Sequence, residues 1–399
     1  MKVLFVTLEF GNHILGGVGR VVNGLTSELR KTLELDVFHL EHSPKYLSFT
    51  AKYYKCSNKN ATKLMDTYPA QYVSSCIKLI KAEKYDLIHV FNSHWIIEKI
   101  IARVTEELPE QKIVYSIHSI AKFEKGIRFN PASSIRCEEL LLEKAQTIHV
   151  LNYSSYVNLT AAYGEIVNDK AVTFIPNGVR SGAYDKEDTV FKRKVKAKLR
   201  GVEFVVLCLS RWAHGKGIEY FLDAAKNLTK RGRNIKFILA GRRSVSWELK
   251  WDSYLKKIDA KAEKLGSSII VLDWVSDEQR NTLFKLCNGY VMPSELEYQP
   301  YSVLEPVAAG VPLISSDLPC VTELLKEQQH CLFFQSRNSE HLAQKIEELM
   351  DRKEEAQIHA KQASEKFLKE YDWEIISEQY LAMYRAALEE PKEELLQVI

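Results

Sequence analysis

A regular alternation of short apolar segments with longer amphipathic stretches is the feature that most restricts the fold of this chain. Helical periodicity appears between the apolar segments, for example at residues 18–30 and 133–144. Nearly continuous apolar strands that alternate with helices indicate a parallel sheet covered by helices on both faces. The predicted strands are 3–8, 36–40, 86–90, 112–117, 147–151 and 172–176, followed by 203–210, 235–241, 268–273, 289–294 and 311–316.

The strand pattern restarts near residue 203, and a chain of 399 residues exceeds the usual size of one domain. We therefore predict two doubly wound α/β domains at residues 1–178 and 202–372, joined by a linker at 179–201. Such sheets bind ligands beyond the carboxyl ends of their strands. The informative residues should therefore follow strands directly.

The composition argues against several functional classes. The chain has 55 Lys and Arg against 52 Asp and Glu, a net charge of +3, which is too balanced to indicate a nucleic-acid partner. We interpret the basic run at 192–200 as a solvated helix face. Seven cysteines without CxxC spacing indicate reduced thiols and no zinc site. The first apolar segment is too short for a signal peptide. We therefore expect a cytoplasmic protein, with peripheral membrane contact and the oligomeric state left open.

A glycine-rich turn follows the first strand, in the stretch EFGNHILGGVGRVV. Gly16, Gly17 and Gly19 would let the backbone approach a ligand closely and expose helix amides to an anion. A dinucleotide fingerprint is a second interpretation, with Asp36 as the ribose-binding acid, although the third glycine of that motif is missing. A flexible loop without a ligand is the third.

Several charged or titratable residues also follow predicted strands. His118 stands at the end of the strand 112–117, where a functional role and a packing role are both open. Arg211 and Lys216 precede an amphipathic helix, and two cations at that end of a helix favour an anionic ligand such as a pyrophosphate over a solvated surface pair. Glu297 and Glu305 stand eight residues apart, and together they could bind neighbouring hydroxyls. Glu305 alone could instead be an ordinary partner of a helix dipole.

Taken in order, these motifs resemble the retaining GT-B glycosyltransferases of family 4, also called glycosyltransferase group 1. The resemblance extends over nearly the whole chain. It implies two Rossmann-like domains facing across a cleft, with residues 202–372 binding a nucleotide sugar and residues 1–178 on the acceptor side. The ending at 373–390 resembles the family's C-terminal helix, which packs back on the first domain. The matching motifs are GGVGR, the strand-end His118, IPNGV, SRWAHGKG and SELEYQPYSVLEPVAAGVPLI.

The resemblance assigns roles to these residues. Glu297 matches the first glutamate of the family's E-x7-E motif, which contacts donor-sugar hydroxyls, and Glu305 matches the second, which binds the ribose. Arg211 and Lys216 match the pair that holds the leaving diphosphate, and His118 matches the residue over the donor sugar. The other implied contacts are Gly17, Trp274, Val275, Tyr301 and Ser302 on the donor side, and Asn12, His13, Gly16 and Gly17 on the acceptor side.

The implied reaction moves a hexose or N-acetylhexosamine from a nucleoside-diphosphate sugar, with UDP expected first, to a hydroxyl group. The acceptor would be a glycan, a lipid-linked molecule or a small molecule. The nucleotide sugar is then a substrate, and no cofactor is expected. A metal is not expected to be required, because fixed cations and helix amides can stabilise the leaving diphosphate and the chain has no D-x-D motif.

The chain also departs from the family pattern. Pro300 stands where the family has a glycine whose amide touches the donor, and proline has no amide hydrogen. Aligning QPYS with the family's Pro-Phe-Gly run would instead put Gln299 at the catalytic position. Asp273 replaces a second glycine, before the base-binding loop. Pro300 therefore leaves a catalytically silent sugar-nucleotide-binding protein as one alternative, and the N-terminal glycines with Asp36 leave a NAD-dependent Rossmann oxidoreductase as another.

Overall fold

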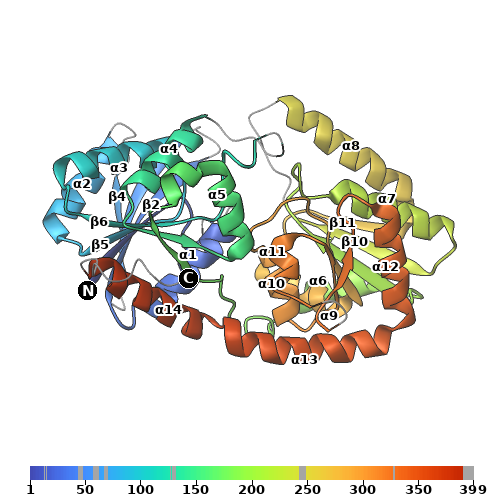
Figure 1. The fold of residues 1–399 in the computed structure, drawn as a ribbon. Coiled ribbons are helices and arrows are strands. Elements are labelled where there is room, and N and C mark those ends of the chain that lie inside the picture. The colour runs from blue at the N-terminus through green and yellow to red at the C-terminus, as the bar shows by residue number, and fades with distance from the viewer. Residues whose placement is uncertain are drawn as a thin grey trace. The chain divides into compact units, whose positions relative to one another are not determined.

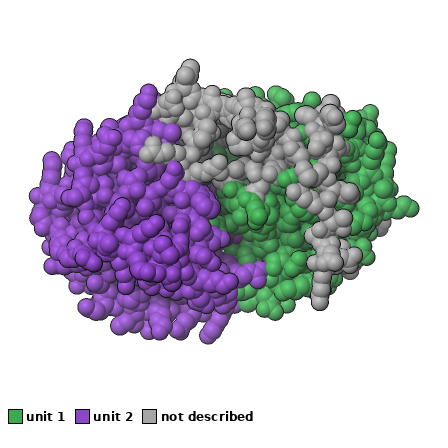
Figure 2. All heavy atoms as spheres, turned by 180° about the vertical axis from the view of Figure 1, so that it is seen from behind, with its two compact units in different colours: residues 1–178, 371–399 green, residues 179–370 purple. Residues whose placement is uncertain are grey.

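The computed structural model describes residues 1–12, 14, 16–43, 48–56, 63–66, 71–125, 127, 132–241, 249–326 and 329–389. The chain divides into two compact units, residues 1–178 with 371–399 and residues 179–370, which Figure 2 colours separately. Each unit contains one mainly parallel sheet. The interval 179–201, expected to be a linker, belongs to the second unit and contains the helix α6 (Thr189–Lys198).

The first unit is built on an eight-stranded sheet in the order β4-β3-β2-β1-β5-β6-β7-β8. Helices α2 to α5 pack in series on one face, and α1 packs with α14 on the other (Figure 1). Its strands are β1 (Lys2–Thr7), β2 (Glu34–Ser43), β3 (Ser48–Lys55), β4 (Lys63–Asp66), β5 (Leu87–Val90), β6 (Lys112–Ser116), β7 (Thr147–Val150) and β8 (Ala171–Phe174). Its helices are α1 (Gly17–Leu29), α2 (Tyr72–Glu83), α3 (Trp95–Glu107), α4 (Ala132–Lys144), α5 (Tyr153–Val167) and α14 (Trp373–Leu388).

All six predicted strands of the first unit are present, but its sheet is not wholly parallel. Strands β3 and β4 were not predicted, and they extend the sheet from β2 as an antiparallel meander. In the sequence of β3, SFTAKYYK, Ser, Thr and Lys are interspersed with apolar and aromatic residues. The strand therefore lacks the continuous apolar run that identifies a strand buried on both faces.

Trp373 fastens the C-terminal helix α14 to the first unit. A Cβ atom placed on Gly24 of α1 would lie 2.1 Å from the Trp373 ring, and one placed on Gly178 would lie 2.6 Å from it. Only glycine at both positions leaves room for the indole. Further along α14, the Tyr384 hydroxyl is 2.7 Å from Nδ1 of His89, which lies on β5. Residues remote in sequence thus complete the first unit.

The second unit contains a six-stranded parallel sheet in the order β11-β10-β9-β12-β13-β14. Helices α12, α7 and α8 pack together, as do α6 and α9 (Figure 1). The strand β14 was not predicted. The strands are β9 (Phe204–Leu209), β10 (Ile235–Ala240), β11 (Ile269–Leu272), β12 (Gly289–Met292), β13 (Leu313–Ser316) and β14 (Leu332–Phe334). The other helices are α7 (Ile218–Lys230), α8 (Leu249–Leu265), α9 (Asp277–Leu286), α10 (Tyr301–Ala308), α11 (Pro319–Thr322), α12 (Ser339–Asp351) and α13 (Lys353–Tyr371).

All seven cysteines are buried free thiols, as the sequence predicted. Within the described residues, no helix is long and apolar enough to cross a membrane.

Candidate active site

The strand order of the second sheet reverses between β9 and β12. The chain runs outward from β9 to β10 and β11 on one side, and from β12 to β13 and β14 on the other. In a doubly wound sheet, ligands bind beyond the carboxyl ends of the strands at such a reversal. The loops that leave these two ends carry Arg211, Lys216 and Glu297. Three predicted catalytic residues therefore lie at the position where this architecture binds ligands.

Lys216 and Glu297 form an ion pair at this point. Lys216 Nζ lies 2.5 Å from Glu297 Oε1, and the two side chains are only 13% and 8% exposed. The loop after β9 is held against the loop after β12, because the Glu295 amide donates to the Gly215 carbonyl over 2.9 Å. Gly217 has a φ of +63°, and a Cβ atom there would lie 1.8 Å from the Pro293 carbonyl oxygen. A glycine next to Lys216 is thus required to bring the cation to the acid.

Arg211 differs from Lys216 in its surroundings. Its side chain is exposed and forms no hydrogen bond or ion pair with the described part of the chain. An exposed guanidinium is suited to bidentate contact with phosphate oxygens. Arg211 is therefore open to an anionic ligand, whereas Lys216 is already bound to Glu297.

Gln299, the alternative to Glu297, is buried in the same loop. Glu297 forms its ion pair with Lys216 in this loop. Pro300 is the N-cap of α10, directly before Tyr301 and Ser302, which are both half-buried. Its ring leaves that cap without an amide hydrogen. Tyr301 and Ser302 thus follow a cap that offers one backbone hydrogen-bond donor fewer than a glycine would.

Glu305 lies on α10, where its partner is Arg280 of α9. Arg280 Nη1 is 3.1 Å from Glu305 Oε1, and both side chains are buried. The guanidinium also lies over the ring of Tyr184, 5.6 Å from its centroid. Arg280 was not predicted from the sequence, because a single arginine in a helix that begins with a capping box gives no sign of burial. The helix dipole was the alternative partner predicted for Glu305, whereas its partner in the structure is the Arg280 cation.

The loop after β11 carries two further predicted donor contacts. Trp274 is 67% exposed, and Val275 beside it is half-buried. The loop is anchored by the Gly241 amide, which donates to the Asp273 carbonyl over 3.3 Å. An indole that remains exposed on an anchored loop has one face available for stacking on a planar ring.

In the first unit, the glycine turn binds a carboxylate of its own chain. Glu9 Oε2 accepts hydrogen bonds from the amides of Gly16, at 2.7 Å, and Gly19, at 3.1 Å. The expectation that the turn exposes its amides to an anionic ligand is therefore wrong for these two groups. Glu9 was missed because nothing in the sequence shows that it folds back over the turn. Gly17 begins α1 between them, Asn12 is exposed, and His13 lies outside the described residues.

The same unit contradicts the dinucleotide interpretation. Asp36 is 2% exposed and lies near the beginning of β2, away from the strand's carboxyl end. Its Oδ2 accepts hydrogen bonds from the hydroxyl groups of Tyr53 and Tyr85, each over 2.7 Å. A carboxylate enclosed in this way cannot reach a ribose, so Asp36 cannot be the ribose-binding acid that the NAD-dependent alternative requires.

His118 follows β6, in the loop at the carboxyl end of that strand. Its half-buried ring stacks on Phe91, with centroids 6.2 Å apart, and meets the edge of His149. Burial, and to a smaller extent His149, lower the pKa of His118 to about 3. Its Nε2 has no hydrogen-bond partner among the described residues. His118 is thus a neutral imidazole with one buried nitrogen that lacks a partner, and it carries no positive charge at neutral pH.

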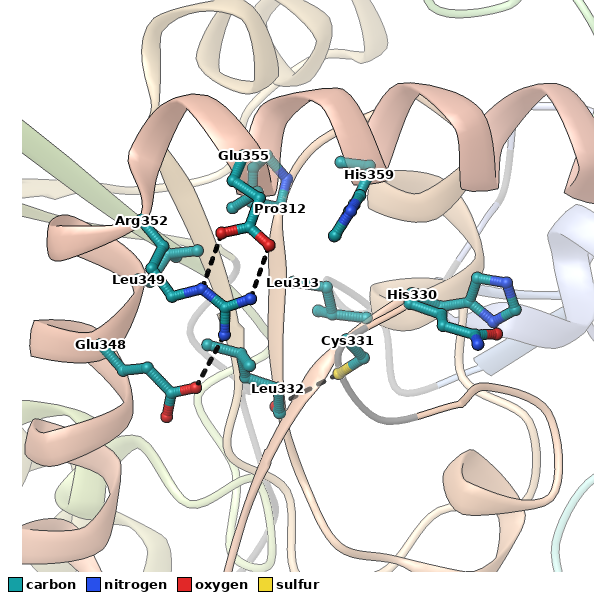
Figure 3. A pocket seen from close by; sticks show the side chains of 13 residues that line it. Pro312, Leu313, His330, Cys331, Leu332, Glu348, Leu349, Arg352, Glu355 and His359 are labelled. Carbon is teal, nitrogen blue, oxygen red and sulfur yellow. Dashed lines mark hydrogen bonds and ion pairs between the residues drawn. The ribbon is translucent and has the colours of Figure 1, made fainter.

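A pocket in the second unit lies elsewhere (Figure 3). It is lined by Leu313 and Leu332, at the amino ends of β13 and β14, which is the opposite end of the sheet from the ligand-binding edge. Its Arg352 guanidinium is already paired with Glu348 and Glu355, as the dashed lines in Figure 3 show. We therefore do not assign the active site to it.

The sequence matches two family profiles along most of its length. Residues 190–366 match the family described as "Glycosyl transferases group 1", and residues 15–181 match "Glycosyltransferase Family 4". The chain therefore belongs to the group 1 glycosyltransferases of family 4.

Similar proteins agree with this assignment. An uncharacterized glycosyltransferase of Methanocaldococcus jannaschii is 24% identical, over 98% of this chain and 99% of the relative. The lipopolysaccharide 1,2-N-acetylglucosaminetransferase of Salmonella typhimurium is 24% identical, over 84% of this chain and 81% of the relative. A UDP-Gal:alpha-D-GlcNAc-diphosphoundecaprenol alpha-1,3-galactosyltransferase of Escherichia coli is 26% identical, over 61% of each chain.

Solved structures establish the fold. Anabaena HepE in complex with UDP and glucose superposes with a TM-score of 0.74, at 18% identity, over 97% of this chain and all of that chain. The sucrose-phosphate synthase of Thermosynechococcus elongatus also gives 0.74, at 16% identity, over 97% and 99%. The fold is GT-B, and the protein is a glycosyltransferase by family.

Proposed function

We propose that this protein is a retaining glycosyltransferase that moves a hexose or N-acetylhexosamine from a UDP-sugar to a hydroxyl group of a glycan, lipid-linked or small-molecule acceptor. One observation carries the proposal. A largely buried Lys216–Glu297 pair and the exposed Arg211 lie on the two loops at the reversal of strand order in the second sheet. Two cations and one acid at that position suit a sugar attached to a diphosphate.

The chemistry follows from these charges. As the bond between the anomeric carbon and the phosphate oxygen breaks, negative charge accumulates on the diphosphate, and Arg211 and Lys216 would stabilise it. Glu297, adjacent to Lys216, would accept hydrogen bonds from sugar hydroxyls next to the breaking bond. The acceptor oxygen would attack on the same face, and its proton would pass to the leaving phosphate. Neutral His118 would contribute a hydrogen bond, and the reaction would need no metal.

The named specificities of relatives support the donor and acceptor classes. The E. coli relative is named for UDP-galactose and a diphosphoundecaprenol-linked sugar. HepE was crystallised with UDP and glucose. A UDP-hexose and a glycan or lipid-linked acceptor are therefore the first substrates to test, and a lipid-linked acceptor would bring the protein to a membrane surface.

The direct test is a thermal-shift panel with UDP, GDP, ADP, dTDP and NAD, followed by turnover of the matching sugar nucleotides. A ligand that binds only the folded protein raises the melting temperature. We expect UDP to do so, and turnover to release a product with the donor's anomeric configuration by NMR, with or without EDTA. Glu297→Gln should abolish turnover, whereas Glu295→Gln, two residues away and paired with Arg337, should retain it. A shift with NAD alone, or an inverted product, would refute the proposal.

A second candidate rests on Pro300. Because this N-cap has no amide to donate, the chain could bind a sugar nucleotide without transferring its sugar. Tight UDP binding with no turnover of any UDP-sugar would favour that function, and replacing Pro300 by Gly should then increase turnover.

A further inference from the structure

Glu138 is a buried carboxylate in the first unit that the proposed chemistry does not use. It lies on α4, is 1% exposed, and forms no ion pair within the described residues. Its oxygens accept hydrogen bonds from the Ala121 amide at 2.8 and 2.9 Å, the Tyr163 hydroxyl at 2.7 Å and the Ser93 hydroxyl at 3.3 Å. Three segments that are separate in sequence thus meet on one side chain.

One of these segments is the loop that carries His118. The Ile117 amide donates to the His149 carbonyl over 2.8 Å, which fixes the beginning of the loop. Three residues after His118, the Ala121 amide meets both oxygens of Glu138. Ile120 and Ala121 are buried. His118 is therefore held between an attachment to β7 and an attachment to Glu138.

Tyr163 is positioned for this contact by an interruption in its own helix. Its φ and ψ of −139° and 28° depart from helical values within α5. The ring is buried, and Lys122 of the loop lies over it, 4.7 Å from the centroid. The loop is thus attached to α5 as well, through the same tyrosine that donates to Glu138.

We propose that Glu138 is a positioning residue for glycosyl transfer, whose carboxylate binds Ala121, Tyr163 and Ser93 and thereby fixes the loop that presents His118 to the sugar. The proposal rests on the proposed function, because it assigns His118 to the reaction.

The charged and titratable neighbours of Glu138 come from four elements. Glu124 lies in the loop that carries His118, Tyr115 lies on β6 and Tyr163 on α5, and Cys137 directly precedes Glu138 on α4. Burial raises the pKa of Glu138 to about 7 against the opposing effect of its hydrogen bonds to Ala121, Tyr163 and Ser93, and Glu124 raises it further. Glutamine, a neutral side chain of the same shape, keeps one oxygen that can accept from Ala121 and should therefore retain most of the anchoring.

The test compares Glu138→Ala, Glu138→Gln and Tyr163→Phe with a control on the same helix, Glu143→Ala, whose side chain is exposed. Hydrogen exchange of a peptide covering residues 117–125 reports the anchoring without any substrate. We expect rapid exchange in Glu138→Ala, an intermediate rate in Tyr163→Phe, nearly wild-type protection in Glu138→Gln, and wild-type protection in the control. Unchanged protection in Glu138→Ala would overturn the proposal. If that variant does not fold, the Tyr163→Phe result decides.

Two further measurements separate positioning from simple structural support. The NMR signal of the His118 ring, assigned with His118→Asn, should shift in Glu138→Ala and begin to titrate closer to pH 6.5, with restoration in Glu138→Gln. Turnover of UDP-glucose in Glu138→Ala should fall about 100-fold, with its KM unchanged, because misplacement by about 1 Å can cost that much. Full turnover with a disordered loop would overturn the proposal. If the wild type has no turnover, the proposed function fails, while exchange and the His118 signal still decide the anchoring.

Discussion

The Lys216–Glu297 pair gives the sharpest energetic prediction. Replacing Lys216 with Met removes the cation that lies 2.5 Å from a carboxylate only 8% exposed. Breaking a buried pair from one side costs about 3–5 kcal/mol, because the other charge stays desolvated. We expect the lower end, about 3 kcal/mol, since Lys216 retains some exposure and water can reach the vacated space.

This loss of stability can also be measured as a decrease in melting temperature. For a unit of the size of residues 179–370, each kcal/mol corresponds to about 2–4 °C, so Lys216→Met should lower the melting temperature by about 6–12 °C. The double variant Lys216→Met with Glu297→Gln should recover most of that loss, because it removes both charges together. The coupling energy in the double-mutant cycle should then be about 2 kcal/mol or more.

The measurement is urea unfolding of the wild type, both single variants and the double variant, with Lys226→Met as the matched control. Lys226 is exposed on α7 and should change stability by less than about 0.5 kcal/mol. If Lys216→Met is as stable as this control, the pair is not desolvated and the reasoning fails. If the double variant is no better than Lys216→Met, the loss arises from packing of the lysine stem instead of charge.

Three further predictions concern other parts of the molecule. Gly217→Ala should destabilise the protein by several kcal/mol and weaken UDP binding, because its Cβ would overlap the Pro293 carbonyl. Gly232→Ala, which is also at positive φ but in open space, should cost only about 1–2 kcal/mol of stability. Equal losses of stability in urea unfolding would contradict this prediction. Arg280→Met leaves Glu305 buried without its cation and should cost about 3–5 kcal/mol, with Glu305→Gln as the compensating second change; a neutral effect on unfolding would show that Glu305 is protonated or hydrated. The fold raises the pKa of Glu138 from about 4.5 to about 7. The stabilisation that results, about 3 kcal/mol, is therefore complete below pH 4.5 and is lost as the pH rises to 7. In Glu138→Gln, the free energy of unfolding should no longer decline between pH 5 and pH 8. If it declines as in the wild type, another group is responsible for the pH dependence.

Much of the fold was predictable, because buried parallel strands show a local signal. Each of the eleven predicted strands is present, since continuous apolar runs such as 203–210 reflect burial on both faces of the sheet. The strands that were missed lack a continuous apolar run, as β3 does, or are very short, as β4 and β14 are, so their pairing depends on neighbouring strands more than on their own composition.

The candidate site was predictable only in part. Residue type and position after strands were enough to single out Arg211, Lys216, Glu297 and His118. The partners of these residues and of their neighbours were not predictable, because Glu9 reaches the Gly16 amide, Arg280 reaches Glu305, and Glu138 reaches Ala121 through folding alone. The periodicity of a sequence does not indicate which hydrogen bonds form between segments that are far apart in the chain.

The sequence by itself therefore determined the α/β class, the two sheets and the group of residues suited to a sugar diphosphate, because periodicity and strand-end position are local properties of the chain. The tertiary structure alone decided the charge and access of each group. It pairs Lys216 with Glu297, leaves Arg211 exposed, and encloses Asp36 beneath two tyrosines. It also keeps His118 neutral by burying it. The physical reason is that desolvation and charge pairing depend on which side chains fold around a group, and those side chains come from distant parts of the sequence.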